Sequence, residues 1–253
     1  MVKINEFDLA FVVDTTSSMG GLIAAAQRQM IDMIDALSHS ATVDMRLGIV
    51  EYRDHPPQDT LVSRVHPFTG NLKSAKRTIN KLSVDGGGDE PEAVFAGLVA
   101  ASGHLKWRTH ARRIAVLVGD APPHGVGCRG DAFREGCPSG ETIHSTSAKL
   151  ETARVRLYAL GLTRGVTESF SLLSSLTGGE FFASGLGDTA ISKLKEILQA
   201  EFGQLEFDRQ VHAAWTSLAD ATVDSVAERL QVKPAQVAAA ASRLTCRDLL
   251  EIN

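Results

Sequence analysis

The sequence has few cysteines, no strong bias of charge and no long apolar run. Its three cysteines (Cys128, Cys137 and Cys246) are too sparse for a disulfide framework, so we expect reduced thiols and a cytoplasmic location. The net charge is −4 with both signs spread along the chain, which argues against nucleic acid as a partner. The N-terminal apolar run LAFVV is far shorter than the about 20 residues of a membrane span. We therefore expect no targeting segment and no membrane association.

What the chain does contain is an alternation of strand and helix patterns. FDLAFVV is a short, mainly apolar run followed by Asp14, which is typical of a buried parallel strand, and apolar residues then recur at helical spacing from Leu22 to Leu37. The alternation continues through further strands at MRLGIVEY, LVSRVHPF, RRIAVLVGD, RLYALGL and GEFFAS, with helical patterns between most of them. Pro67 marks LVSRVHPF as an edge strand. The pattern predicts an α/β fold, a doubly wound, mostly parallel sheet with helices on both faces.

The strand pattern stops near residue 205. We expect one domain over residues 1–205, whose last helix runs from Ile191 to Phe202. At residues 202–207 the alternation of strand and helix patterns ends. Residues 206–253 carry only helical patterns, among them VDSVAERL and a helix that begins at Pro234. This appendage is near the lower size limit for a fold that is stable alone, so we expect it to pack on the main domain or on a partner.

Two strand ends and one loop carry carboxylates. Asp14 closes the first strand and Asp120 closes RRIAVLVGD, and in open α/β sheets ligands bind at such strand ends. Between them, DGGGDEP interrupts regular structure before the helix EAVFAGLVAASGHL. With Pro91 in the first turn of that helix, Asp89 and Glu90 would lie at its N-terminus, where carboxylates are favoured.

The first loop has the pattern D-x-T-x-S at Asp14, Thr16 and Ser18. In an extended segment alternate side chains point to the same side, so three oxygen donors can converge there. Oxygen ligands of this kind suit a hard cation such as Mg²⁺, whereas zinc favours histidine and cysteine. A cation with few bound carboxylates keeps positive charge and attracts an acid from outside.

Three ordered motifs, DTTSSM, GGGDEPEAV and VGDAPPHG, make the chain resemble the von Willebrand factor A domain with its metal-ion-dependent adhesion site. The resemblance covers about residues 5 to 200. The second and third motifs are similar to those of the von Willebrand factor A domains attached to atypical alpha-kinases, although the sequence has no kinase motif. It implies a Rossmann-like fold and a divalent cation, Mg²⁺ or else Mn²⁺ or Ca²⁺.

Position by position, the resemblance implies that Asp14, Thr16, Ser18 and Asp120 hold the metal, with threonine at position 16 where serine is more usual. The second loop departs from the family pattern, because the threonine that normally supplies a ligand is missing. A strict alignment places Gly88 there, and we take Asp89 as the substitute ligand. The alternative for Asp89 is a carboxylate that only caps a helix, and Glu92 is interpreted as structural.

The resulting hypothesis is a protein-interaction module, not an enzyme, in which the metal binds an acidic residue of a protein partner. One alternative is a metal-assisted hydrolase or phosphatase, which needs a general base that the sequence does not nominate. Another is a sensor that acts through its C-terminal helices. These helices have the form of a helix-turn-helix, but residues 208–253 hold five Lys and Arg against six Asp and Glu, which disfavours DNA.

Other side-chain groups allow weaker alternatives. His124, Cys128, Cys137 and His144 could make a zinc site, although their spacing is poor, and Cys128 with Cys137 could form a disulfide. Arg53 and Asp54 could be an acid/base pair, but a salt bridge that braces a loop is the more common role. Ser17 or Ser18 with His55 could be a hydrolase couple, but no G-x-S-x-G turn supports it.

Overall fold

The computed structural model describes residues 4–38, 43–183 and 189–251 and contains one six-stranded sheet. Its strand order is β3-β2-β1-β4-β5-β6, and every neighbouring pair is parallel except β2 and β3. The strands are β1 (Glu6–Asp14), β2 (Asp44–Tyr52), β3 (Ser63–Thr69), β4 (Arg112–Gly119), β5 (Arg156–Gly161) and β6 (Phe181–Ala183). The doubly wound, mostly parallel sheet that the sequence predicts is confirmed, and the Pro67 strand lies at an edge.

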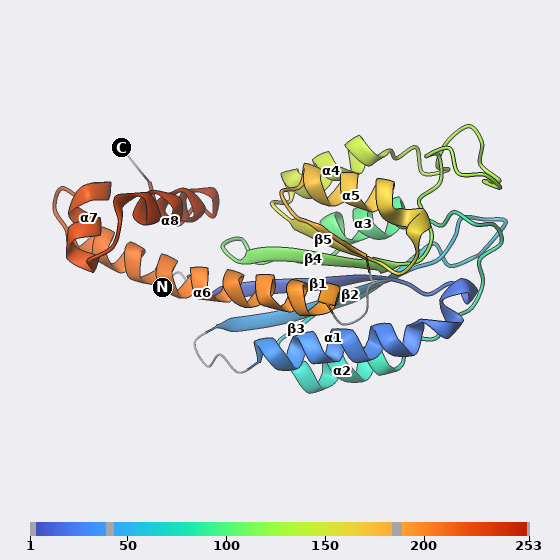
Figure 1. Ribbon diagram of the computed structural model, residues 1–253, viewed down its shortest axis with the longest axis horizontal. Helices are drawn as coiled ribbons and strands as arrows, with labels where there is room; N and C mark the ends of the chain where they lie inside the picture. Colours follow the sequence, from blue (N-terminus) through green and yellow to red (C-terminus); the bar gives the residue numbers. More distant parts are fainter. Residues whose placement is uncertain (1–3, 39–42, 184–188, 252–253) are drawn as a thin grey trace.

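Helices cover both faces of this sheet (Figure 1). One face carries α1 (Ile23–Leu37), α2 (Leu72–Asn80) and the first part of α6 (Thr189–Ser217). The other carries α3 (Val94–Gly103), α4 (Ile143–Thr152) and α5 (Thr167–Leu176). Two short 3-10 turns, η1 (Ser17–Gly21) and η2 (Arg164–Val166), and the helices α7 (Val223–Leu230) and α8 (Pro234–Cys246) complete the described elements.

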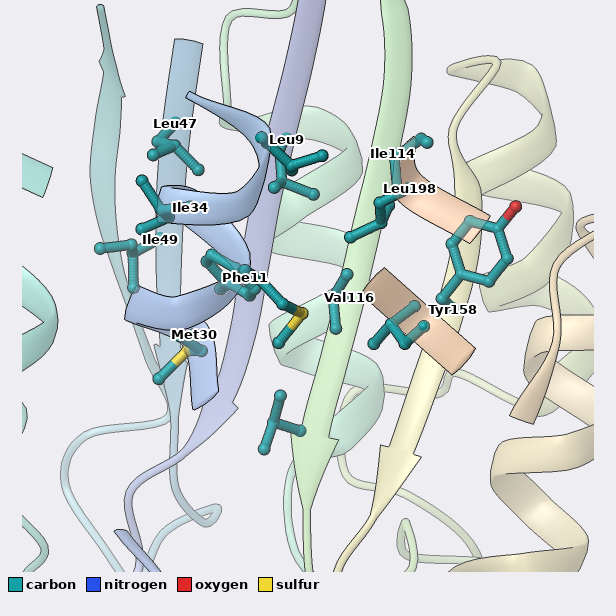
Figure 2. Close-up of a cluster of buried hydrophobic side chains, with 14 of the residues drawn as sticks. Leu9, Phe11, Met30, Ile34, Leu47, Ile49, Ile114, Val116, Tyr158 and Leu198 are labelled. Atoms are coloured by element: carbon teal, nitrogen blue, oxygen red, sulfur yellow. The ribbon is translucent and has the colours of Figure 1, made fainter. Parts of the chain in front are cut away.

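Burial on both faces explains why β1 is apolar from Leu9 to Val13. Phe11 belongs to the core under α1 and α6, where it packs with Met30, Ile34 and Leu198 (Figure 2). Val12, the next residue, belongs to the core under α3 and α5. Successive side chains of a strand point to opposite faces, so a strand between two helical layers has no polar face.

The long helix α6 corrects the expected break near residues 202–207. It runs without interruption from beneath the sheet to α7 and α8, which lie beyond the end of the sheet (Figure 1). Its first half gives Leu198 and Phe202 to the sheet core, whereas Val211 and Ala214 pack in a separate cluster with α7 and α8. The apolar pattern changes because the helix changes the core that it packs against, and not because the helix ends.

The start of α3 also differs from the prediction. The helix begins at Val94, so Asp89 and Glu90 lie in the preceding loop and not at its N-terminus. The backbone N–H of Glu92 donates to the carbonyl of Pro122, and Glu92 forms a bridge with Pro123. This pairing holds the second loop extended against the loop that follows β4, which delays the first helical turn.

Among the described helices, none combines the length and the apolar character needed to cross a lipid bilayer.

Candidate metal site at the sheet edge

The candidate site lies where two neighbouring parallel strands end. Asp14 is the last residue of β1, and Asp120 follows the last residue of β4. The chain leaves β1 toward α1 on one face and leaves β4 toward α4 on the other. In doubly wound sheets the crevice between two such strands is the usual place for a ligand.

Four side chains of the site form an unbroken series of oxygen contacts. The Thr16 hydroxyl donates to Asp14 Oδ1 at 2.7 Å and lies 3.1 Å from the Ser18 hydroxyl. The Ser18 hydroxyl in turn donates to Asp120 Oδ1 at 3.0 Å. The fold thus brings together Asp14, Thr16, Ser18 and Asp120, which are four of the five residues that the sequence suggested as ligands.

The spacing of these oxygens fits a small octahedral cation. Neighbouring ligands of an octahedral ion with bonds of about 2.0–2.1 Å lie roughly 2.9 Å apart. The second carboxylate oxygen of Asp14, Oδ2, is buried and has no hydrogen-bond partner. A divalent cation would satisfy this oxygen and the hydroxyl lone pairs together, so the residues present fit a metal.

The raised pKa values of the two carboxylates also favour a bound cation. Asp14 is fully buried, and burial, with a smaller contribution from the charge of Asp120, raises the pKa of Asp14 to about 7. Burial also raises the pKa of Asp120. Within the described parts of the chain, no lysine or arginine forms an ion pair with either carboxylate, so positive charge is lacking where a cation would supply it.

Glu92 brings the second loop to this site. Its carboxyl group is 2% exposed, its Oε2 has no hydrogen-bond partner, and burial, followed by the charge of Asp14, raises its pKa to about 10. Gly87, at φ +80°, lets the loop pass so closely that an added Cβ would lie 3.0 Å from Glu92 Oε1 and 3.2 Å from Thr16 Cβ. The structure therefore places Glu92 beside Asp14 and Thr16, where the sequence analysis interpreted it as structural.

Replacing Glu92 by glutamine should separate metal binding from stability. At pH 7 without metal the carboxyl group is protonated in the folded protein but ionised in the unfolded chain. Glutamine ionises in neither state, so in EDTA the free energy of unfolding should rise by up to about 3 kcal/mol. Mg²⁺ binding should weaken about 10-fold, the lower end of the effect of losing a supporting group. Urea unfolding in EDTA and calorimetric Mg²⁺ titration measure the two effects. The control is Glu90→Gln, on the exposed part of the same loop, and unchanged Mg²⁺ affinity in Glu92→Gln would exclude Glu92 from the site.

Asp89, the fifth suggested ligand, lies in a different group. Its Oδ2 accepts a hydrogen bond from the backbone N–H of Ala132, and its carboxylate approaches Asp54 and His124. That Asp89 is a ligand of the Asp14 site remains a prediction. In the structure its carboxylate is grouped with Asp54 and His124. Sequence reasoning missed this grouping because each residue follows a different strand or loop.

The structure also bears on the alternative side-chain groupings. Cys128 and Cys137 are free thiols, and Cys137 contacts His55 at 3.4 Å. His124 is instead held by two carboxylates, so the four suggested zinc ligands do not assemble. Ser18 bonds to Asp120, and no described contact joins it to His55. Arg53 pairs with Asp59 and Asp85, which is the loop-bracing role.

A doubly wound α/β domain with an oxygen-rich site on its first loop is thus established by geometry. Residues 8–123 match the family model of the von Willebrand factor A domain. The chain carries a von Willebrand factor A domain, as the three ordered motifs suggested.

Curated relatives share this region but are longer. The chain is 27% identical over 157 residues to the alpha-protein kinase vwkA of Dictyostelium discoideum, which covers 60% of the chain and 24% of the relative. It is 32% identical over 120 residues to a putative ariadne-like RING finger protein of Acanthamoeba polyphaga mimivirus, which covers 46% of the chain and 11% of the relative. The chain therefore spans about a quarter or less of these relatives.

Solved structures share the fold. The protein BatB from Bacteroides thetaiotaomicron superposes with a TM-score of 0.55 at 13% identity, covering 78% of this chain and 99% of BatB. Proximal thread matrix protein 1 of the mussel byssus, in a structure with a zinc-occupied MIDAS motif, has a TM-score of 0.56 at 17% identity, covering 78% of this chain and 46% of that protein. At these identities the likeness concerns the fold alone.

Proposed function

We propose that this protein is a metal-ion-dependent protein-interaction module. A divalent cation, Mg²⁺ or else Mn²⁺ or Ca²⁺, is held by Asp14, Thr16, Ser18 and Asp120, with Glu92 as the contribution of the second loop. An acidic side chain of a partner protein completes the ion's ligands. Von Willebrand factor A domains commonly mediate metal-dependent protein interactions, which agrees with this assignment.

The observation that carries the proposal is the buried, unpaired oxygen of Asp14 at one end of the series of hydroxyl contacts. The other end of the series is open, because Ser18 is exposed and Asp120 is half-buried. An ion at this site would thus be buried on the Asp14 side and accessible on the Ser18 side. An ion that keeps net positive charge and an accessible position favours a carboxylate as its outside ligand.

The loop between Asp120 and α4 is the surface that would select the partner. Together with α3 and α5 it borders a cavity of about 490 Å³ whose lining includes Phe95, Pro122 and Leu172. Val126 on the loop and Leu172 on α5 are exposed apolar side chains. A partner that places a carboxylate on the ion could bury these side chains in the same contact.

We further propose binding without catalysis. Among the described residues near the site, His124 bonds to Asp54 and Asp131 and His55 contacts Cys137, so we assign neither imidazole as a general base. The three free cysteines support a reducing, cytoplasmic location. The C-terminal helices lie at the opposite end of the sheet from the site (Figure 1), so a regulatory partner bound there would not contact the ion.

A peptide array tests the proposal directly. Each immobilised peptide carries one Asp or Glu, and its matched control carries Asn or Gln at the same position. Binding of the labelled protein in Mg²⁺ to carboxylate peptides, lost in EDTA and absent for the amide controls, supports the proposal. Binding that is equal in Mg²⁺ and EDTA, or equal for acid and amide peptides, would refute it.

A further inference from the structure

A second group of potential ligands lies next to the Asp14 site, on three different loops. Asp54 follows β2, Asp89 lies in the second loop, and His124 lies in the loop after β4. One ligand atom from each of the three residues falls within 4.8 Å of the others. Asp54 and His124 are fully buried, and Asp89 is half-buried.

The imidazole of His124 has the orientation of a metal-binding histidine. Its Nδ1 lies 2.9 Å from Asp131 Oδ1, while its Nε2 faces Asp54 at 2.6 Å. Asp131 also accepts hydrogen bonds from the backbone N–H groups of Gly125 and Phe133. Although burial raises the pKa of Asp131, these hydrogen bonds together lower it below its ordinary value. A carboxylate fixed in this way selects the Nδ1–H tautomer and leaves Nε2 to bind an ion.

Two carboxylate oxygens of the group have no partner. Asp54 Oδ1 accepts hydrogen bonds from the backbone N–H of His55 and from His124, but Asp54 Oδ2 has none. Asp89 Oδ2 accepts from Ala132, but Asp89 Oδ1 has none. Both unpaired atoms are buried. Unpaired buried acceptors of this kind are rare in folded proteins and call for a specific partner.

We propose that Asp54, Asp89 and His124 form a second divalent metal site, separate from the one on the Asp14 loop. One imidazole nitrogen and two carboxylates suit a transition ion such as Mn²⁺ or Zn²⁺ better than Mg²⁺, which prefers oxygen alone. Because each ligand comes from a different loop, the ion ties together the three loops that border the Asp14 site. After burial, the charges of Asp14, Asp54 and Asp89 also raise the pKa of Glu92, so Glu92 is within electrostatic reach of both groups.

The competing explanation is an imidazolium held between two carboxylates. Burial lowers the pKa of His124, but its bonds to Asp54 and Asp131 outweigh burial and raise it, which favours the protonated ring in the metal-free protein. This ion pair accounts for one oxygen of Asp54, and Asp54 Oδ2 and Asp89 Oδ1 are then satisfied only if Asp89 holds a proton that it shares with Asp54, in line with the raised pKa of Asp89. A metal ion would bind Asp54 Oδ2, Asp89 Oδ1 and the His124 imidazole together. On His124 it would take the place of the proton on Nε2.

Metal stoichiometry distinguishes the two explanations. After equilibrium dialysis against Mn²⁺, atomic emission should find two ions per wild-type chain, one in Asp14→Ala and one in His124→Gln. His144→Gln, at an exposed position on α4, is the matched control and should keep both ions. If His124→Gln does not fold, Asp89→Asn at the half-buried edge of the group provides the same reading, with Glu90→Gln as its control.

A spectroscopic measurement identifies the ligand. With Co²⁺ bound, the Nδ1–H of His124 should give a strongly shifted proton NMR signal that disappears in D₂O. The signal should persist in Asp14→Ala and in His144→Gln and be lost in His124→Gln. Asp131→Asn should retain the site but weaken it about 10- to 100-fold, as expected for a group that orients a ligand.

Each outcome decides between the hypotheses. A single ion in the wild type that Asp14→Ala removes would overturn the second site and leave the proposed function standing. A single ion that survives Asp14→Ala but is lost in His124→Gln and Asp89→Asn would support the second site and remove the first. Two ions that both survive His124→Gln and Asp89→Asn would overturn the assignment of these ligands.

Discussion

Replacing Asp14 by alanine is expected to weaken Mg²⁺ binding by more than about 100-fold and to abolish capture of acidic peptides. Loss of an outer group that merely supports a ligand already weakens metal binding about 10- to 100-fold, and Asp14 is a direct ligand in the proposed site. Its Oδ2 is the buried oxygen of the series that has no hydrogen-bond partner, so the substitution removes the atom that an ion would satisfy. Calorimetric titration with Mg²⁺ and the peptide array give the two readings.

The same variant should not unfold the metal-free protein. Alanine removes the hydrogen bonds that Asp14 accepts from the Thr16 backbone and hydroxyl, but it also removes a carboxylate that burial destabilises. Asp14→Asn keeps a side-chain acceptor and is the better variant if alanine loosens the loop. Asp220→Ala, at an exposed position far along the chain, is the control for losing one negative charge. Mg²⁺ affinity within about threefold of wild type in a folded Asp14→Asn protein would contradict the site, since that is less than about 1 kcal/mol.

The strands, the helices of the main domain and the position of four suggested ligands at one edge of the sheet could be predicted because each depends on a local pattern. An apolar run that ends in an aspartate is readable as a buried strand with a carboxylate at its tip, as for Asp14 and Asp120. The spacing of Thr16 and Ser18 along one loop then determines where their hydroxyls can point. These inferences need no knowledge of which loops meet.

The missed features all depend on contacts between loops. Glu92 reaches Thr16 because its backbone pairs with Pro122, and no periodicity in GGGDEPEA signals that pairing. The grouping of Asp54 with His124 joins residues that are 70 positions apart. The signal that was present was chemical, because a histidine and two aspartates, each assigned a different role from the sequence, follow strands or lie in loops at one edge of the expected sheet.

The continuity of α6 was missed for a related reason. A helix is usually recognised by one apolar stripe, but α6 packs on the sheet through Leu198 and Phe202 and on α7 and α8 through Val211. When the buried face changes along a helix, the pattern loses its phase although the backbone continues. Whether residues 1–205 and 206–253 are separate domains stays a prediction, because one helix contributes to both cores.

In EDTA, stability is expected to fall as the pH rises from about 5 to 8. Burial raises the folded-state pKa of Asp14 from 3.8 to about 7 and that of Glu92 from 4.5 to about 10. A group whose pKa is raised on folding contributes stability below its unfolded pKa and loses that contribution as the pH climbs through the folded value. At about 1.4 kcal/mol per pKa unit, Asp14 alone lowers the free energy of unfolding by about 3 kcal/mol between pH 5 and pH 8.

Mg²⁺ should reverse this trend, because the ion and the protons compete for the same oxygens. Stabilisation by saturating Mg²⁺ is therefore expected to be small at pH 5 and largest near pH 8, which urea unfolding with and without EDTA can measure. Asp14→Asn isolates the share of Asp14, since it should reduce the pH dependence in EDTA while leaving the contribution of Glu92 and the opposing contribution of His55, whose pKa burial lowers. An Asp14→Asn protein with the same pH slope as wild type would mean that Asp14 is ionised in the folded state without metal. The buried carboxylate would then have a cationic partner already, and the argument for an ion at this edge of the sheet would fail.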